Sequence, residues 1–91
     1  MIMEFVQAKF TPLLFGPNRG KTIDEVAMTA QGLLHLDWMR QAMLIEKHRE
    51  ARHHRRIPLH RAEMLEALTT FLDDSTIAKD LAAVNNGDGD W

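Results

Sequence analysis

The stretch that most constrains the fold is a turn rich in glycine and proline, Gly16-Pro17-Asn18-Arg19-Gly20. Glycine takes positive φ at little cost and proline fixes its own φ, so the chain must change direction here. An apolar run, residues 13–15, precedes the turn. Thr22 follows it with Glu25 three residues later, which is the spacing of a helix N-cap. The sequence therefore predicts a corner where a short buried strand meets a short helix.

Residues 2–10 lie before this corner and alternate weakly between apolar and polar side chains. Phe5, Val6 and Phe10 favour a strand, and a short helix is the alternative for so brief a run. Thr11-Pro12 ends the segment, because the residue before a proline is pushed towards extended geometry. We therefore expect a minor β element at the N-terminal corner.

The remainder of the chain has helical periodicity. One helix is expected from Leu33 through residues 47–56, which we call the basic segment, to just before Pro58, with Trp38 and Ile45 widening its apolar stripe. A second is expected over 59–72, and a third over 76–84 after a cap at 73–75. The predicted fold is mainly α with a minor β element: a short N-terminal β corner followed by three to four packed helices. Residues 1–84 would form a single small domain and 85–91 an acidic flexible tail.

Length and composition exclude several classes of protein. At 91 residues the chain has room for one modest core. It contains no cysteine, so neither a disulfide framework nor a cysteine zinc site is available. No apolar run is long enough to span a membrane, and the first residues do not resemble a secretory signal. We expect a cytoplasmic protein that does not contact a membrane.

Charge is strongly segregated along the chain, although the formal net charge is only −2. Residues 47–61 carry six lysines and arginines against Glu50 alone, together with four histidines. Residues 62–91 carry Lys79 against seven acidic side chains. The local pattern is therefore more informative than the total.

The basic segment is the main candidate for a binding site. Arginine suits phosphate, because its planar fork gives two N–H bonds to one group. The candidate nucleic-acid-binding residues are Arg49, Arg52, Arg55 and Arg56, assisted by Arg19 and Lys21 at the turn. Two simpler interpretations remain open: a solvated helix face, or pairing with the acidic third of the chain. The histidine spacings match no zinc motif, so we expect no metal site.

The turn also invites comparison with the nucleotide-binding P-loop, G-x-x-x-x-G-K-[ST]. Only three residues separate Gly16 from Gly20, and Pro17 removes one N–H group. The chain is also too short for the parallel sheet that such a loop requires. If the turn has only a structural role, we expect a small core around it, formed by Phe15, Ile23, Val26 and Trp38.

Three short motifs follow one another between residues 13 and 40: Leu14-Phe15-Gly16, Gly20-Lys21-Thr22-Ile23-Asp24-Glu25-Val26 and Leu36-Asp37-Trp38-Met39. In this order they resemble a small accessory domain at the C-terminal end of exodeoxyribonuclease X-like exonucleases, which also occurs as stand-alone small bacterial and phage proteins. Pro17 stands where that family usually has lysine, so Arg19 or Lys21 would have to supply its contact. The resemblance implies a non-catalytic binding accessory.

The sequence thus leads to a functional hypothesis and one alternative. The first is a non-catalytic accessory protein that binds nucleic acid through backbone contacts largely independent of sequence, with DNA favoured over RNA and both left open. The alternative is a small phage-type regulator or inhibitor that binds a host protein, with a homodimer also open. Neither hypothesis involves an enzymatic activity or a cofactor.

Overall fold

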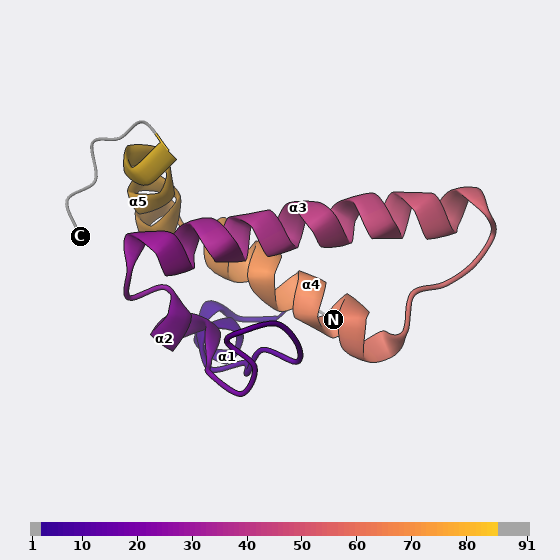
Figure 1. Cartoon of the computed structure of the whole chain (residues 1–91), viewed down its shortest axis with the longest axis horizontal. Coiled ribbons are helices and arrows are strands. Elements are labelled where there is room, and N and C mark those ends of the chain that lie inside the picture. The colour runs from indigo at the N-terminus through magenta and orange to yellow at the C-terminus, as the bar shows by residue number, and fades with distance from the viewer. Residues whose placement is uncertain (1–2, 86–91) are drawn as a thin grey trace.

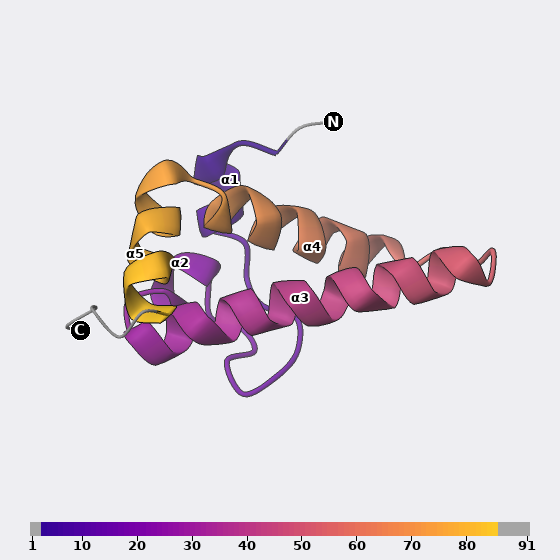
Figure 2. The same ribbon diagram turned by 90° about the horizontal axis from the view of Figure 1, so that it is seen from above.

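The computed structural model describes residues 3–85, which form a mainly helical fold (Figure 1). The helices are α1 (Phe5–Lys9), α2 (Ile23–Val26), α3 (Ala30–Arg52), α4 (Leu59–Leu72) and α5 (Ser75–Asn85). α3 and α4 run antiparallel, and α5 stands across the end where α3 begins and α4 finishes (Figures 1 and 2). The predicted mainly α class is confirmed.

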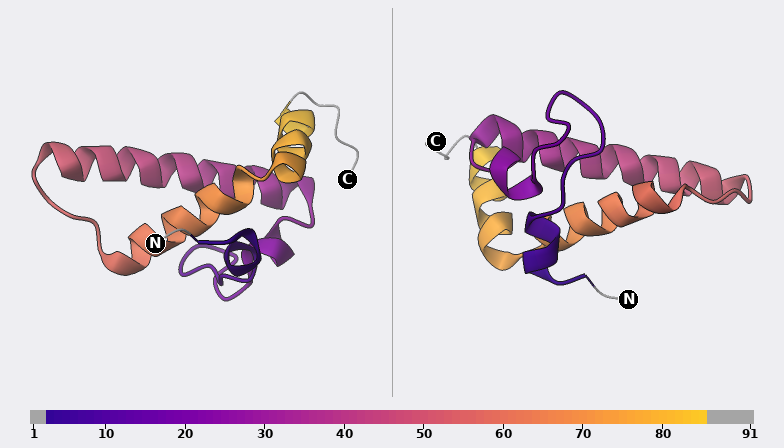
Figure 3. Two further views of the ribbon diagram at one scale, coloured as in Figure 1. Left: turned by 180° about the vertical axis from the view of Figure 1, so that it is seen from behind. Right: turned by 90° about the horizontal axis from the view of Figure 1, so that it is seen from below.

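The core lies where α4 packs against α1 and the first half of α3. Phe71 and Leu68 of α4 are almost fully buried there, and Ile23 of α2 is completely buried. α1 lies against α4, as the views from behind and below also show (Figure 3). The largest side chains buried almost completely are Leu13, Ile23, Leu33, Leu36, Met39, Met64, Leu68, Phe71 and Leu72.

The predicted N-terminal strand is wrong, because residues 5–9 form the helix α1. Phe5 and Ala8, three residues apart, face the core: the Phe5 ring stacks on Phe71 with centroids 5.4 Å apart, and Ala8 is completely buried. Val6 is 58 % exposed. Burial against α4 thus follows the helical period and overrides the weak preference of these side chains for a strand.

The predicted strand at residues 13–15 is also absent from the described residues, which contain a single isolated bridge between Pro12 and Thr22. Leu13 N–H donates to the Lys21 carbonyl (2.9 Å) and Gly20 N–H to the Leu13 carbonyl (3.0 Å). Pairing goes no further, because proline has no N–H to donate and Gly16 and Gly20 bend the backbone with φ of 90° and 89°. The corner is a closed loop without a sheet.

Local capping chemistry sets the starts of several helices. Thr22 Oγ1 accepts from Glu25 N–H (3.2 Å), which confirms the predicted N-cap of α2. Thr29 Oγ1 accepts from Gly32 N–H (3.0 Å), so α3 begins at Ala30, three residues earlier than expected. Asp74 Oδ2 accepts from Thr76 N–H (3.2 Å) at the start of α5, within the cap predicted at 73–75.

α3 ends at Arg52 and not just before Pro58. His54 adopts a left-handed φ of 58° and donates its N–H to the Ala51 carbonyl (3.1 Å), while Arg55 N–H donates to the Glu50 carbonyl (2.8 Å). These two bonds form a Schellman motif, which stops a helix whether or not a proline follows.

The C-terminal prediction is tested only in part. α5 includes Asn85, the first residue assigned to the flexible tail, and residues 86–91 lie outside the described residues. Within residues 3–85, no helix combines the length and the apolar character needed to cross a membrane.

Candidate nucleic-acid interface

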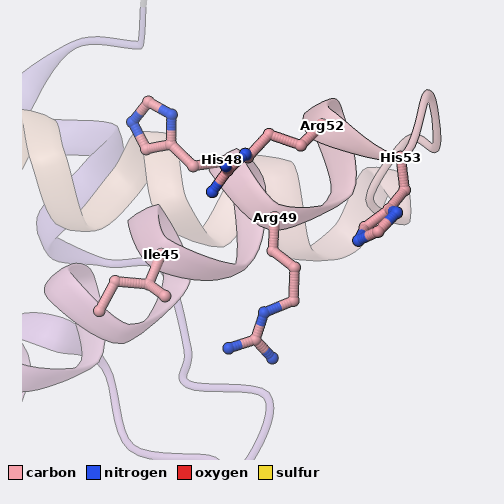
Figure 4. Close-up of a pocket in the computed structure, with 5 residues that line it drawn as sticks. All are labelled: Ile45, His48, Arg49, Arg52 and His53. Carbon is pink, nitrogen blue, oxygen red and sulfur yellow. The ribbon is translucent and has the colours of Figure 1, made fainter.

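The basic segment places a group of side chains on one face of α3 near its C-terminal end (Figure 4). Ile45, His48, Arg49, Arg52 and His53 border a hollow of about 570 Å³. Arg49 extends from the helix between Ile45 and His53 (Figure 4). All five residues come from one stretch of chain, so the hollow has no opposite wall that could enclose a small ligand. It is open to the surroundings on the side away from the helix.

This end of α3 extends beyond the core. Met43 is the last buried side chain of the helix, and no residue from 44 to 52 is buried. Glu46 ties this half to α4 through Arg61, whose Nη2 lies 2.6 Å from Glu46 Oε2. The exposed face therefore stands out from the body of the fold, where a partner can approach it.

The four candidate arginines of the basic segment differ in their position and in their ion pairs. Arg49 and Arg52 lie together on α3 and are exposed, and neither forms an ion pair within residues 3–85. Arg55 is held by Glu50, with Nε 2.9 Å from Oε2. Arg56 is exposed in the coil before α4, so Arg55 and Arg56 lie beyond the helix that was expected to continue to Pro58.

Pairing of the basic segment with the acidic third is not observed among residues 3–85. Asp73 pairs with Arg40 instead (3.0 Å), and Met3 N–H donates to Glu66 Oε1 (3.0 Å). Asp88 and Asp90 lie outside the described residues. In the described part of the chain, Glu50 is the only acidic side chain paired with the basic segment's candidate arginines.

Backbone N–H groups of the glycine turn are hydrogen-bonded within the loop itself. The N–H groups of Arg19, Gly20 and Lys21 donate to carbonyl groups of the same loop at 3.0–3.2 Å. A P-loop needs such N–H groups to hold phosphate, so the loop is not built as one. The side chains of Arg19 and Lys21 are exposed.

An apolar pocket that the sequence did not predict lies between the turn and α3. Its lining comes from Phe15, Gly16, Pro17, His35, Trp38 and Met39, and its volume is about 380 Å³. Trp38 is 63 % exposed and stacks on His35, with ring centroids 5.9 Å apart. The prediction that Trp38 belongs to a small core is therefore wrong.

The helical phase of α3 could have revealed this exposed face. Buried Leu36 and Met43 are seven residues apart, and Trp38 and Ile45 form a second such pair two positions along the chain. Two residues correspond to about 200° around a helix, so the second pair points away from the core. The wide apolar stripe expected from the sequence therefore consists of two separate faces of the helix, one buried and one exposed.

The pocket and the exposed arginines share one face of α3. Trp38, Ile45, Arg49 and Arg52 follow one another at steps of seven, four and three residues, which keep to one side of a helix. Trp38 and Arg52 are about 21 Å apart along the axis, at 1.5 Å per residue. The turn with Arg19 and Lys21 lies at the Trp38 end, so the predicted basic residues form two clusters separated by an apolar stretch.

No group of three or more histidine, aspartate or glutamate side chains within residues 3–85 is placed to hold a metal ion. Comparisons with known protein families, curated proteins and solved structures give no match to this chain.

Proposed function

We propose that this chain is a non-catalytic accessory protein that binds nucleic acid through phosphate contacts largely independent of sequence. The observation that carries the proposal is the exposure of Arg49 and Arg52 on one face of α3, beyond the core and without an ion pair among residues 3–85. Like charges so close together destabilise a helix, and an anionic partner relieves that repulsion.

The chemistry of these side chains favours phosphate as the anion. A guanidinium group binds two phosphate oxygens at once, and each neutralised phosphate releases condensed counterions from the polymer. Arg49 and Arg52 are separated by about 4.5 Å along the helix axis, so both can contact one backbone. Arg55 is engaged with Glu50 and would contribute less, while Arg56, Arg19 and Lys21 would extend the contact.

The resemblance to the accessory domain of exodeoxyribonuclease X-like exonucleases supports the same class of function and favours DNA over RNA. Four of the six residues that line the pocket beside the basic face belong to the resembling motifs: Phe15, Gly16, Trp38 and Met39. The family domain is non-catalytic, so the resemblance carries no nuclease activity with it.

The test is the salt dependence of binding, measured by fluorescence anisotropy with labelled single- and double-stranded oligonucleotides. The double variant Arg49→Ala/Arg52→Ala is expected to bind roughly tenfold more weakly. The slope of log K against log salt should fall by about 1.4 for a single strand or about 1.8 for a duplex, because two phosphate contacts are lost.

The matched control is Lys47→Ala/Lys79→Ala, which removes the same charge from exposed positions on α3 and α5. Lys47 is two residues from Arg49 and therefore points to another side of the helix. The control should change affinity and slope much less. If DNA and RNA, single- or double-stranded, all fail to bind at low salt, the proposal is overturned.

A protein-binding role is the second candidate, favoured by a separate apolar surface. Val6 and Phe10 are four residues apart at α1, and each is 58 % exposed. Capture of one stoichiometric protein after nuclease treatment, abolished by Phe10→Asp, would favour this regulator over the nucleic-acid proposal.

A further inference from the structure

We propose that the pocket formed by Phe15, Gly16, Pro17, His35, Trp38 and Met39 stacks an unpaired nucleobase, so that the protein binds single-stranded nucleic acid in preference to duplex. The inference rests on the proposed function and specifies the form of its partner. The argument depends on the shape of the pocket, on its rigidity and on its position beside the arginines.

The pocket offers flat apolar surfaces. Trp38, His35 and Phe15 supply aromatic rings, and Pro17 supplies a rigid ring beside them. The volume of about 380 Å³ lies near the lower end of the ~300–1,000 Å³ range for small-molecule sites. Trp38 is 63 % exposed, so its ring is accessible to a planar ligand.

The walls of the pocket are held in place before any ligand binds. The Arg61 guanidinium lies over the Phe15 ring, 5.1 Å from its centroid, and is paired with Glu46 at 2.6 Å. This link joins the turn to α4 and α3. His35 stacks on Trp38 from the same helix with an interplanar angle of 17°. A preorganised aromatic surface loses less entropy when it binds a planar ligand.

The positive side chains around the pocket favour, as its ligand, a base that belongs to a polyanion. Arg19 and Lys21 lie on the turn at one side of the pocket, and Arg49 and Arg52 follow on the same face of α3. A strand with a base at Trp38 would run over Ile45 and reach Arg52 about 21 Å away. Aromatic platforms combined with a positive track are the usual features of single-strand binding surfaces.

Duplex nucleic acid cannot use the pocket in the same way, because its bases are stacked on one another and must be flipped out first. The basic face can still contact the phosphates of a duplex. The pocket would therefore supply the difference in affinity between the two forms. Replacing an aromatic residue that stacks on a base by alanine typically weakens single-strand binding by roughly tenfold.

The first experiment measures Trp38 fluorescence in a Trp91→Phe background, since these are the two tryptophans of the chain. The probe is oligothymidylate of about ten nucleotides, with a duplex of equal length for comparison. Stacking of a base on the indole quenches its emission, so the single strand should quench strongly and the duplex weakly.

The second experiment measures affinities by anisotropy. Trp38→Ala should weaken single-strand binding roughly tenfold and leave duplex binding nearly unchanged, while Trp38→Phe retains most of the affinity. Because Trp38 is largely exposed, these variants should fold, which circular dichroism checks. The matched control is Met28→Ala, an exposed large apolar residue (74 %) that lies outside the pocket and should have no effect.

The outcomes separate this inference from the proposed function. If single strand and duplex bind with equal affinity and Trp38 emission is unchanged, the stacking site is wrong and the phosphate-binding proposal stands. If Trp38→Ala weakens both forms equally, the pocket does not discriminate and the inference is again overturned. If neither polymer binds, both proposals fail.

Discussion

Gly32, in the first turn of α3, lies directly against the end of α2. A Cβ atom built on Gly32 would sit 1.8 Å from the Val26 carbonyl oxygen and 2.8 Å from its carbon. The Gly32 N–H also donates to the Thr29 cap. A glycine inside a helix usually reduces stability, whereas this one allows α2 and α3 to pack at their observed distance.

Gly32→Ala is therefore expected to lower the free energy of unfolding by about 2 kcal/mol or more, because backbone must move to make room. Urea denaturation followed by circular dichroism measures the change. Gly20→Ala is the comparison: Gly20 has φ of 89° but no heavy atom within 4 Å of the added Cβ, so it should cost about 1–2 kcal/mol from backbone conformation alone. A stabilising Gly32→Ala would show that the two helices are not in this contact.

At the scale of the element, α3 has two parts with different roles. Its residues up to Met43 supply Leu33, Leu36, Met39 and Met43 to the core, and its last nine residues carry the exposed basic face. The Schellman motif at His54 fixes where the basic helix ends, and so which arginines are helical. Arg49 and Arg52 fall inside the helix, whereas Arg55 and Arg56 fall outside it.

His54→Gly should raise the free energy of unfolding by about 0.5–1 kcal/mol, because glycine adopts the left-handed conformation without the penalty of a side chain. His53→Gly is the matched control: His53 has φ of −99°, where glycine brings only extra freedom in the unfolded chain and should destabilise slightly. Chemical denaturation of both variants measures the difference. A destabilising His54→Gly would contradict the assigned helix end.

At the scale of the whole molecule, the N-terminal segment closes the core. α1 covers α4 through the stacked rings of Phe5 and Phe71, which are parallel to within 6°. The two residues are 66 positions apart in the chain. Their contact therefore depends on the complete fold and cannot form through local structure.

Phe5→Ala is expected to lower the free energy of unfolding by about 2 kcal/mol, somewhat less than for a fully buried phenylalanine because Phe5 is half-buried. Val6→Ala should change it by less than about 0.5 kcal/mol, since Val6 is mostly exposed. Thermal unfolding of the two variants makes the comparison. Equal effects would contradict the helical packing of α1.

Local chemistry in the sequence was sufficient for much of the helical framework. The Thr22 cap, the cap at 73–75 and the helix over 59–72 were predicted within a residue or so, because each depends on neighbours three or four positions away. The basic segment was also found from composition alone. The composition did not show that Arg49 and Arg52 lie within the helix while Arg55 lies beyond it, since this depends on where α3 ends.

The sequence by itself determined the mainly helical class, the caps at Thr22 and at 73–75, and the location of the positive charge. Only the tertiary structure decided that residues 5–9 are a helix and that Trp38 stays at the surface beside the turn. The physical reason is the same in both cases: an apolar side chain has no preference for one partner until distant segments compete for it. Burial against α4 selected the helical face of α1, and Leu36 and Met39 occupy the core side of α3, which leaves Trp38 at the surface beside the turn.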